Sequence, residues 1–169
     1  MTIALKTLIG KLNKPSRMAT EQAANACLSR GHYEVDLEHL FLALSEQADG
    51  DVALVLRANR IDADALRADL DRELQTFKTG NTRTPVFSVH LQKLFQQAWL
   101  LASLDARITH IRSGHLLLAL LTEADLSQLA HRGSALFGRI RLEDLKHDFD
   151  KLPAGSSEAA GGGARARDT

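Results

Sequence analysis

The chain has 169 residues, of which 44% are hydrophobic and 25% charged, and its 21 basic and 21 acidic side chains cancel. This length is enough to bury a substantial core, and the balanced charge, with no basic run along any predicted helix, argues against nucleic acid as a partner. The single cysteine, Cys27, excludes an internal disulfide, and no apolar run approaches the roughly 20 residues of a membrane span. Because Lys6 and Lys11 interrupt the apolar N-terminus, we expect no secretory signal and a cytoplasmic protein.

The first predicted element is a short amphipathic helix within residues 1–12. Its apolar residues at helical spacing are Leu5, Leu8, Ile9 and Leu12. Asn13 is the expected N-cap of a second helix, with Pro15 in the first turn, where its missing N–H costs nothing. In that helix the predicted inward stripe is Met18, Gln22, Ala23, Ala26 and Cys27.

Three further helices complete the first half of the chain. Asp36 can cap a helix over 37–45, a shorter helix follows over 52–59, and Asp62 can cap the next one. Ile61 and Leu66 flank that cap at the spacing of a hydrophobic staple. The polar stretch 76–85 then joins the two halves.

The second half follows the same plan. Ser88 is the expected cap of a helix with the apolar stripe Leu91, Leu94, Phe95, Ala98 and Ala102. Ser113 is the expected cap of a helix over 115–121. Ile140 and Leu145 repeat the staple spacing.

The two halves are related by a constant offset, which aligns Glu-His-Leu-Phe-Leu-Ala-Leu at 38–44 with Gly-His-Leu-Leu-Leu-Ala-Leu at 114–120. The prediction is an all-α domain over 1–152, built as a pseudo-twofold duplicated four-helix repeat. The repeats cover about 13–75 and 88–150, preceded by an extra N-terminal helix over 1–12. Since catalysis rarely needs two copies of one apolar helix, duplication favours a binding scaffold.

From Pro153 the composition changes to Ala, Gly and Ser, which cannot bury a core. We expect residues 153–169 to be a flexible linker or tail, either native or added in cloning.

Catalytic and metal chemistry find little support in the sequence. There is no G-x-x-x-x-G-K-[ST] motif, so no nucleotide site is expected within these residues, and no catalytic residue is assigned. The set His32, Glu34, Asp36, Glu38 and His39 could suggest a divalent metal, or simply a polar loop that leads into a capped helix. Without H-E-x-x-H or a cysteine pair, we expect no metal, and His39 and His115 are expected to hydrogen-bond helix ends or loops.

The two aligned segments resemble the Glu-His-Leu-Leu helix starts of the Clp N-domain, the double-repeat domain at the front of Hsp100/Clp AAA+ unfoldases. The leading segment Leu5–Asn13 and the segments 85–88, 98–103 and 111–121 are similar to the ClpV branch, which serves type VI secretion. The resemblance covers about residues 13–150. It implies a non-enzymatic receptor that is cytoplasmic, monomeric in isolation and part of a hexamer at full length, with ATP and Mg only in ATPase modules beyond residue 169.

The resemblance also implies a partner. In the ClpV branch this domain captures an N-terminal helix of the large sheath subunit (VipB/TssC type), or a similar helix of an accessory protein, with no role for nucleic acid or membrane. Helix capture needs an apolar groove. One candidate wall is Leu5, Leu8, Ile9 and Leu12, and the other is Phe87 with Leu91. Phe87 is the expected anchor because its staple position holds polar Gln92.

One departure from the family's motif bears on which ligands are expected. Family members that bind phosphorylated arginine use the motif glutamate of each repeat, and here Glu38 has Gly114 as its counterpart. This argues against phosphoarginine recognition. The alternatives that stay open are a Clp N-domain that binds an adaptor or other substrates, and a small helical hydrolase or metalloenzyme.

Overall fold

The computed structural model describes residues 3–105, 108–147 and 156–158. Its helices in chain order are α1 (Leu5–Gly10), α2 (Lys14–Ser29), α3 (Leu37–Ser45), α4 (Asp51–Ala58), α5 (Ala63–Leu74), α6 (Val89–Ser103), α7 (Ser113–Thr122), α8 (Ala124–Gly133), the 3-10 helix η1 (Ala135–Arg139) and α9 (Leu142–His147). The short strands are β1 (Glu34–Val35) and β2 (Val86–Phe87).

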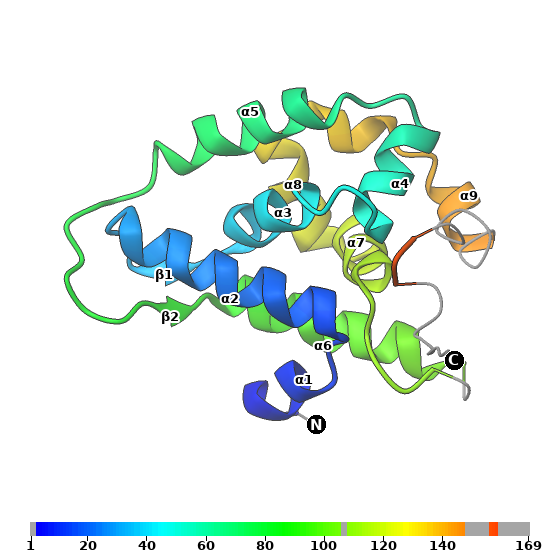
Figure 1. Cartoon of the computed structure of the whole chain (residues 1–169), viewed down its shortest axis with the longest axis horizontal. Helices are drawn as coiled ribbons and strands as arrows, with labels where there is room; N and C mark the ends of the chain where they lie inside the picture. Colours follow the sequence, from blue (N-terminus) through cyan, green and yellow to red (C-terminus); the bar gives the residue numbers. More distant parts are fainter. Residues whose placement is uncertain (1–2, 106–107, 148–155, 159–169) are drawn as a thin grey trace.

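The duplicated helices α3 and α7 form the centre of the molecule (Figure 1). Every residue of α3 except Leu42 is buried, and α7 is buried from Ser113 to Leu120. In this view α5 lies along the top, α2 and α6 lie beneath the central helices, and α1 is lowest. α2 packs against α3 as α6 packs against α7, so the duplication seen in the sequence is also a duplication of packing.

The prediction of a purely α-helical domain missed one small feature. β1 and β2 pair in parallel, with Val35 opposite Phe87, and Leu12 forms an isolated parallel bridge with Ile111. The offset that aligns the two motifs also relates Val35 to Ile111, so each repeat contributes one extended residue that pairs with the segment before the first helix of the other repeat. These two pairings join the repeats.

Most predicted helix starts are confirmed. The side chains of Asn13, Asp36, Asp62 and Ser88 each accept a backbone N–H in the first turn of their helix. The prediction for Ser113 was wrong, because Arg112 is the N-cap and Ser113 is the first helical residue.

The predicted inward face of α2 needs correction. Met18 and Gln22 are exposed, and the buried residues are Ser16, Ala19, Thr20, Ala23 and Cys27. A helix this rich in alanine has little apolar contrast around its circumference, so composition alone placed the stripe about one position off.

The C-terminal prediction is only partly open to test, since 148–155 and 159–169 lie outside the described residues. The three described residues between them do not behave as a free tail. Ser157 donates its N–H to the carbonyl of Asp49 at 2.8 Å, and Glu158 is buried. Within the described ranges, the helices are all too short or too polar to cross a membrane.

Candidate functional site

The leading helix α1 packs against α6, and the four predicted groove residues in and just after this helix fall into two classes. Leu8 and Leu12 are fully buried and belong to the core. Leu5 and Ile9 are only half-buried, although they also pack against that core. In this structure, therefore, Leu5 and Ile9 can reach a ligand, whereas Leu8 and Leu12 support the helix from beneath.

The end of α1 is fastened to the second repeat by backbone bonds. The N–H of Asn13 donates to the carbonyl of Ile111 at 2.8 Å, and the N–H of Ile111 donates to the carbonyl of Lys11 at 2.7 Å. The Lys11 ammonium lies 4.9 Å from the ring centroid of Trp99 on α6, within cation–π range. Since both contacts cross between repeats, α1 has a defined position against α6.

The second predicted wall begins at β2. Phe87 is half-buried and packs against the core, and its carbonyl accepts the side-chain N–H of Gln92. Leu91 is fully buried. Two neighbours that the sequence analysis did not single out are far more exposed, Val86 at 61% and Val89 at 72%. Val86 lies in the two-residue strand β2 and Val89 is the first residue of α6, and both side chains face the surface. These elements are too short at this point for the sequence to show which side chains are exposed.

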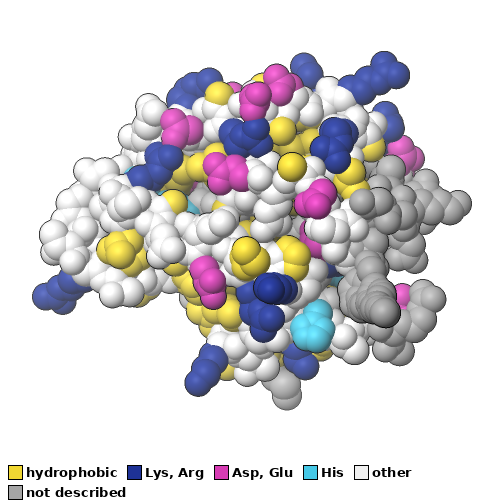
Figure 2. Space-filling model, in the orientation of Figure 1, with side chains coloured by type: hydrophobic (Ala, Val, Ile, Leu, Met, Phe, Trp, Pro, Cys, Tyr) yellow, Lys and Arg dark blue, Asp and Glu magenta, His cyan; other side chains and the backbone are white. Residues whose placement is uncertain are grey.

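Hydrophobic side chains also gather on the surface shown in Figure 2, in the lower part of the molecule, where Figure 1 places α1 below α2 and α6. The structure thus combines a short fastened helix with exposed apolar side chains nearby. This arrangement can bind an apolar helix face but offers no nucleophile or acid–base pair among the predicted residues.

A separate apolar pocket of about 520 Å³ lies at the far end of α6. It was not predicted, because its walls come from three elements and the loop after α6. Its lining residues are Leu101, Leu104, Asp105, Ile108, His115, Leu118, Thr122 and Lys146.

The two motif histidines have the predicted structural role. Nδ1 of His39 accepts the N–H of Asp36 at 2.9 Å, and Nδ1 of His115 accepts the N–H of Arg112 at 3.0 Å. Each imidazole therefore closes the first turn of a central helix, which explains why histidine occurs in both copies of the motif.

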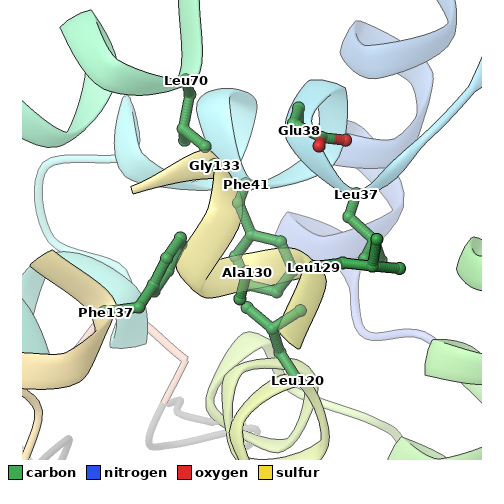
Figure 3. A pocket seen from close by; sticks show the side chains of 9 residues that line it. All are labelled: Leu37, Glu38, Phe41, Leu70, Leu120, Leu129, Ala130, Gly133 and Phe137. Carbon is green, nitrogen blue, oxygen red and sulfur yellow. The ribbon is translucent and has the colours of Figure 1, made fainter. Parts of the chain in front are cut away.

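Glu38, the acidic residue of the first motif, lies at a small apolar pocket (Figure 3). The other lining residues come from α3, α5, α7, α8 and η1, and all of them are apolar or glycine: Leu37, Phe41, Leu70, Leu120, Leu129, Ala130, Gly133 and Phe137. Burial, with the negative charges of Asp36 and Glu73, raises the pKa of Glu38 from 4.5 to about 7. A carboxyl group that is half neutral at pH 7 is a weak partner for a cation.

The residues that the structure brings together as possible metal ligands differ from those considered in the sequence. Ligand atoms of Cys27, His32 and His39 lie within 4.8 Å of one another, all in buried side chains. The sequence gives no reason to group Cys27 with the histidines, because Cys27 comes from α2 and their proximity depends on tertiary packing.

Hydrogen bonding in this cluster does not suit a metal ion. Nδ1 of His39 accepts the Asp36 N–H, so its proton resides on Nε2, which lies 2.9 Å from Nδ1 of His32. A metal-bound histidine needs the opposite arrangement, with one nitrogen on the metal and the other N–H donated to an acceptor. Burial raises the pKa of Cys27 to about 11 and lowers that of His39 to about 4, which favours a neutral packed cluster.

Comparisons with known proteins agree with the duplicated fold. The family described as Clp repeat (R) N-terminal domain matches residues 11–131. The chaperone protein ClpB of Yersinia enterocolitica is 35% identical over 158 residues, which are 94% of this chain and 18% of that protein. The AAA+ ATPase ClpV1 of Pseudomonas aeruginosa is 30% identical over 156 residues, 92% of this chain and 17% of that protein.

A solved structure of a complex of the ClpV N-domain with a VipB peptide superposes with a TM-score of 0.81 at 38% identity, covering 94% of this chain and 96% of that one. The chain spans less than a fifth of the length of the two curated relatives. Since the family match covers most of the chain, including the whole first repeat and the second repeat as far as residue 131, the chain belongs to the family of Clp repeat N-terminal domains.

Proposed function

We propose that the chain is the substrate-recognition domain of a ClpV-like AAA+ unfoldase and captures an N-terminal helix of the type VI sheath subunit (VipB/TssC type). The observation that carries this proposal is the likeness, over 94% of the chain, to a ClpV N-domain in complex with a VipB peptide. The domain itself catalyses nothing in this scheme. ATP and Mg act in ATPase modules beyond residue 169, in a cytoplasmic hexamer, whereas the isolated domain is a monomer.

The surface around α1 and β2 supports helix capture. α1 packs against α6, and backbone hydrogen bonds to Ile111, just before α7, fix the end of α1, so a ligand helix meets a preformed wall. Leu5 and Ile9 are half-buried on α1, and Phe87 is half-buried beside the exposed Val86 and Val89. Preformed apolar walls limit the ordering cost of binding to that of the peptide alone.

Differences in burial support two proposed roles among the six predicted groove residues. Leu5, Ile9 and Phe87 contact the ligand helix, and Phe87 is its anchor. Leu8, Leu12 and Leu91 are fully buried, so they hold the walls in place. Val86 and Val89 extend the second wall, because they are the most exposed apolar side chains beside Phe87.

A second candidate is a Clp N-domain that binds an adaptor or other unfoldase substrates, which the 35% identity to a ClpB chaperone favours. Phosphoarginine recognition stays disfavoured in either case. Glu38 is buried with a pKa raised to about 7, and Gly114 supplies no second carboxylate.

Fluorescence anisotropy tests the proposal with a labelled peptide from the N-terminus of the cognate large sheath subunit. Saturable binding is expected, with none for a peptide of the same composition in scrambled order. A peptide from the cognate accessory protein, added unlabelled, should compete if both use one groove. Equal binding of the ordered and scrambled peptides, or of neither, would contradict sheath-helix capture.

A further inference from the structure

We propose that a carboxylate-binding site lies between the two repeats and that Glu158, from the chain's own C-terminal segment, occupies it and supplies the carboxylate that the N-cap of α7 lacks. The proposed groove does not predict this contact. It rests on the described residues Ser156–Glu158, which lie against the starts of α4 and α7.

The carboxylate of Glu158 accepts four hydrogen bonds. Oε1 accepts the N–H of Ser113 at 2.7 Å and the side-chain amide of Asn13 at 3.0 Å. Oε2 accepts the N–H of Asp51 at 2.8 Å and the hydroxyl of Ser113. The residue is only 3% exposed, so both oxygens are satisfied within the protein. Two backbone N–H groups at two helix starts are a favourable setting for an anion.

The pseudo-symmetry explains why such a site exists. In the first repeat, the Asp36 carboxylate accepts the N–H of Leu37 at 2.8 Å and the hydroxyl of Ser88, the cap of α6, at 2.9 Å. The offset between the repeats puts Arg112 in the place of Asp36 and Ser113 in that of Leu37. The second repeat therefore lacks its own carboxylate at this position.

Glu158 takes over the role that Asp36 has in the first repeat. It accepts the first N–H of α7, from Ser113, as Asp36 accepts the first N–H of α3. It also binds Asn13, the cap of α2, as Asp36 binds the cap of α6. Glu158, 45 residues beyond Ser113, thus provides the carboxylate that the second repeat lacks because it has Arg112 where the first has Asp36.

The surrounding groups are arranged to accept this carboxylate. Arg112 turns away to form a bidentate pair with the buried Asp51, both bonds being 2.7 Å, so Asp51 is already neutralised. Gly50 leaves room, because a Cβ there would lie 3.3 Å from Oε2 of Glu158. The bonds join Asn13 and Asp51 of the first repeat to Ser113 of the second, so the docked segment ties the repeats together.

Nuclear magnetic resonance on the full chain tests the contact directly. In the wild type we expect a scalar coupling across the hydrogen bond between the Ser113 amide nitrogen and the Glu158 carboxylate carbon. In Glu158→Gln, which keeps the size of the side chain, the amide protons of Ser113 and Asp51 should shift upfield and exchange about tenfold faster. The matched control is Glu21→Gln on the exposed face of α2, which should change neither.

Binding of a separate peptide tests whether the site recognises a carboxylate. Added to the Glu158→Ala chain, acetyl-Ser-Ser-Glu-Ala-Ala-amide should saturably restore the wild-type shifts of Ser113 and Asp51, and the glutamine version of the peptide should not. Absence of the coupling together with unchanged amides in Glu158→Gln would overturn the docking. Equal effects of the two peptides, or no effect of either, would overturn the carboxylate site.

Discussion

At the scale of single residues, one pseudo-symmetric position shows how the two repeats have diverged. Glu38 and Gly114 are the corresponding motif residues, and only the first has a side chain that can ionise. Glu38 is buried at the small pocket of Figure 3, which holds its pKa near 7. Because burial opposes its ionisation, this residue makes the stability of the fold depend on pH.

Glu38→Gln should remove that dependence. Between pH 4.5 and 7 the unfolded chain releases the Glu38 proton while the folded chain retains it, so the free energy of unfolding falls as pH rises through this window. The fall attributable to Glu38 is on the order of 3 kcal/mol and is complete above pH 7. Urea unfolding from pH 4 to 8 should show Glu38→Gln gaining stability over the wild type as pH rises. A constant difference across this range would show that Glu38 ionises normally.

Phe87→Ala tests the anchor of the proposed groove. Removal of a half-buried ring that contacts the ligand should weaken sheath-peptide binding at least about tenfold, as is typical of a central anchor. Leu104→Ala is the matched control, because this side chain is 84% exposed just beyond the other end of α6. Titration of both variants should show loss of affinity in Phe87→Ala alone. Equal affinities would move the anchor elsewhere.

At the scale of elements, the six residues of α1 include both a core residue and residues of the proposed groove. Leu8 points into the core and Leu5 lies at its edge, although both occupy the same predicted stripe. An apolar stripe in the sequence shows which residues of a helix point inward, but it does not show how much of each side chain the neighbouring helix covers.

This difference in burial predicts different effects for two similar substitutions. Leu8→Ala should lower the free energy of unfolding by about 2–5 kcal/mol, because it leaves a cavity in the core. Leu5→Ala should cost about 1 kcal/mol or less and act mainly on peptide affinity. Denaturant unfolding and peptide titration of both variants check this division. A larger loss of stability in Leu5→Ala than in Leu8→Ala would reverse the assignment.

Elements with local signals were predictable from the sequence. The caps at Asn13, Asp36, Asp62 and Ser88 depend on one side chain and the next turn, so each could be identified in advance. The strand pair could not, because two residues are too few to show a period of two. Contacts between distant segments, such as Cys27 with the histidines or Glu158 with Ser113, depend on packing and leave no local pattern.

At the scale of the whole molecule, the two repeats pair with each other through short extended segments and share one hydrophobic core. The pairings of Phe87 with Val35 and of Leu12 with Ile111 each cross from one repeat to the other, and both adjoin the walls of the proposed groove. The duplication could be predicted from the constant offset between the two motif copies, and it implied a scaffold for binding. The groove residues were predicted through family resemblance, and the structure adds which of them are accessible.

We propose that a sheath helix binds between α1 and the start of α6. The most direct measurement is a titration of the isotope-labelled chain with the cognate sheath peptide, followed by the chemical shifts of backbone amides and methyl groups. We expect the largest changes on residues 5–12 and 86–91, with small changes in the pocket around Leu101 and Leu118. Changes centred on that pocket, or spread evenly over the domain, would contradict it.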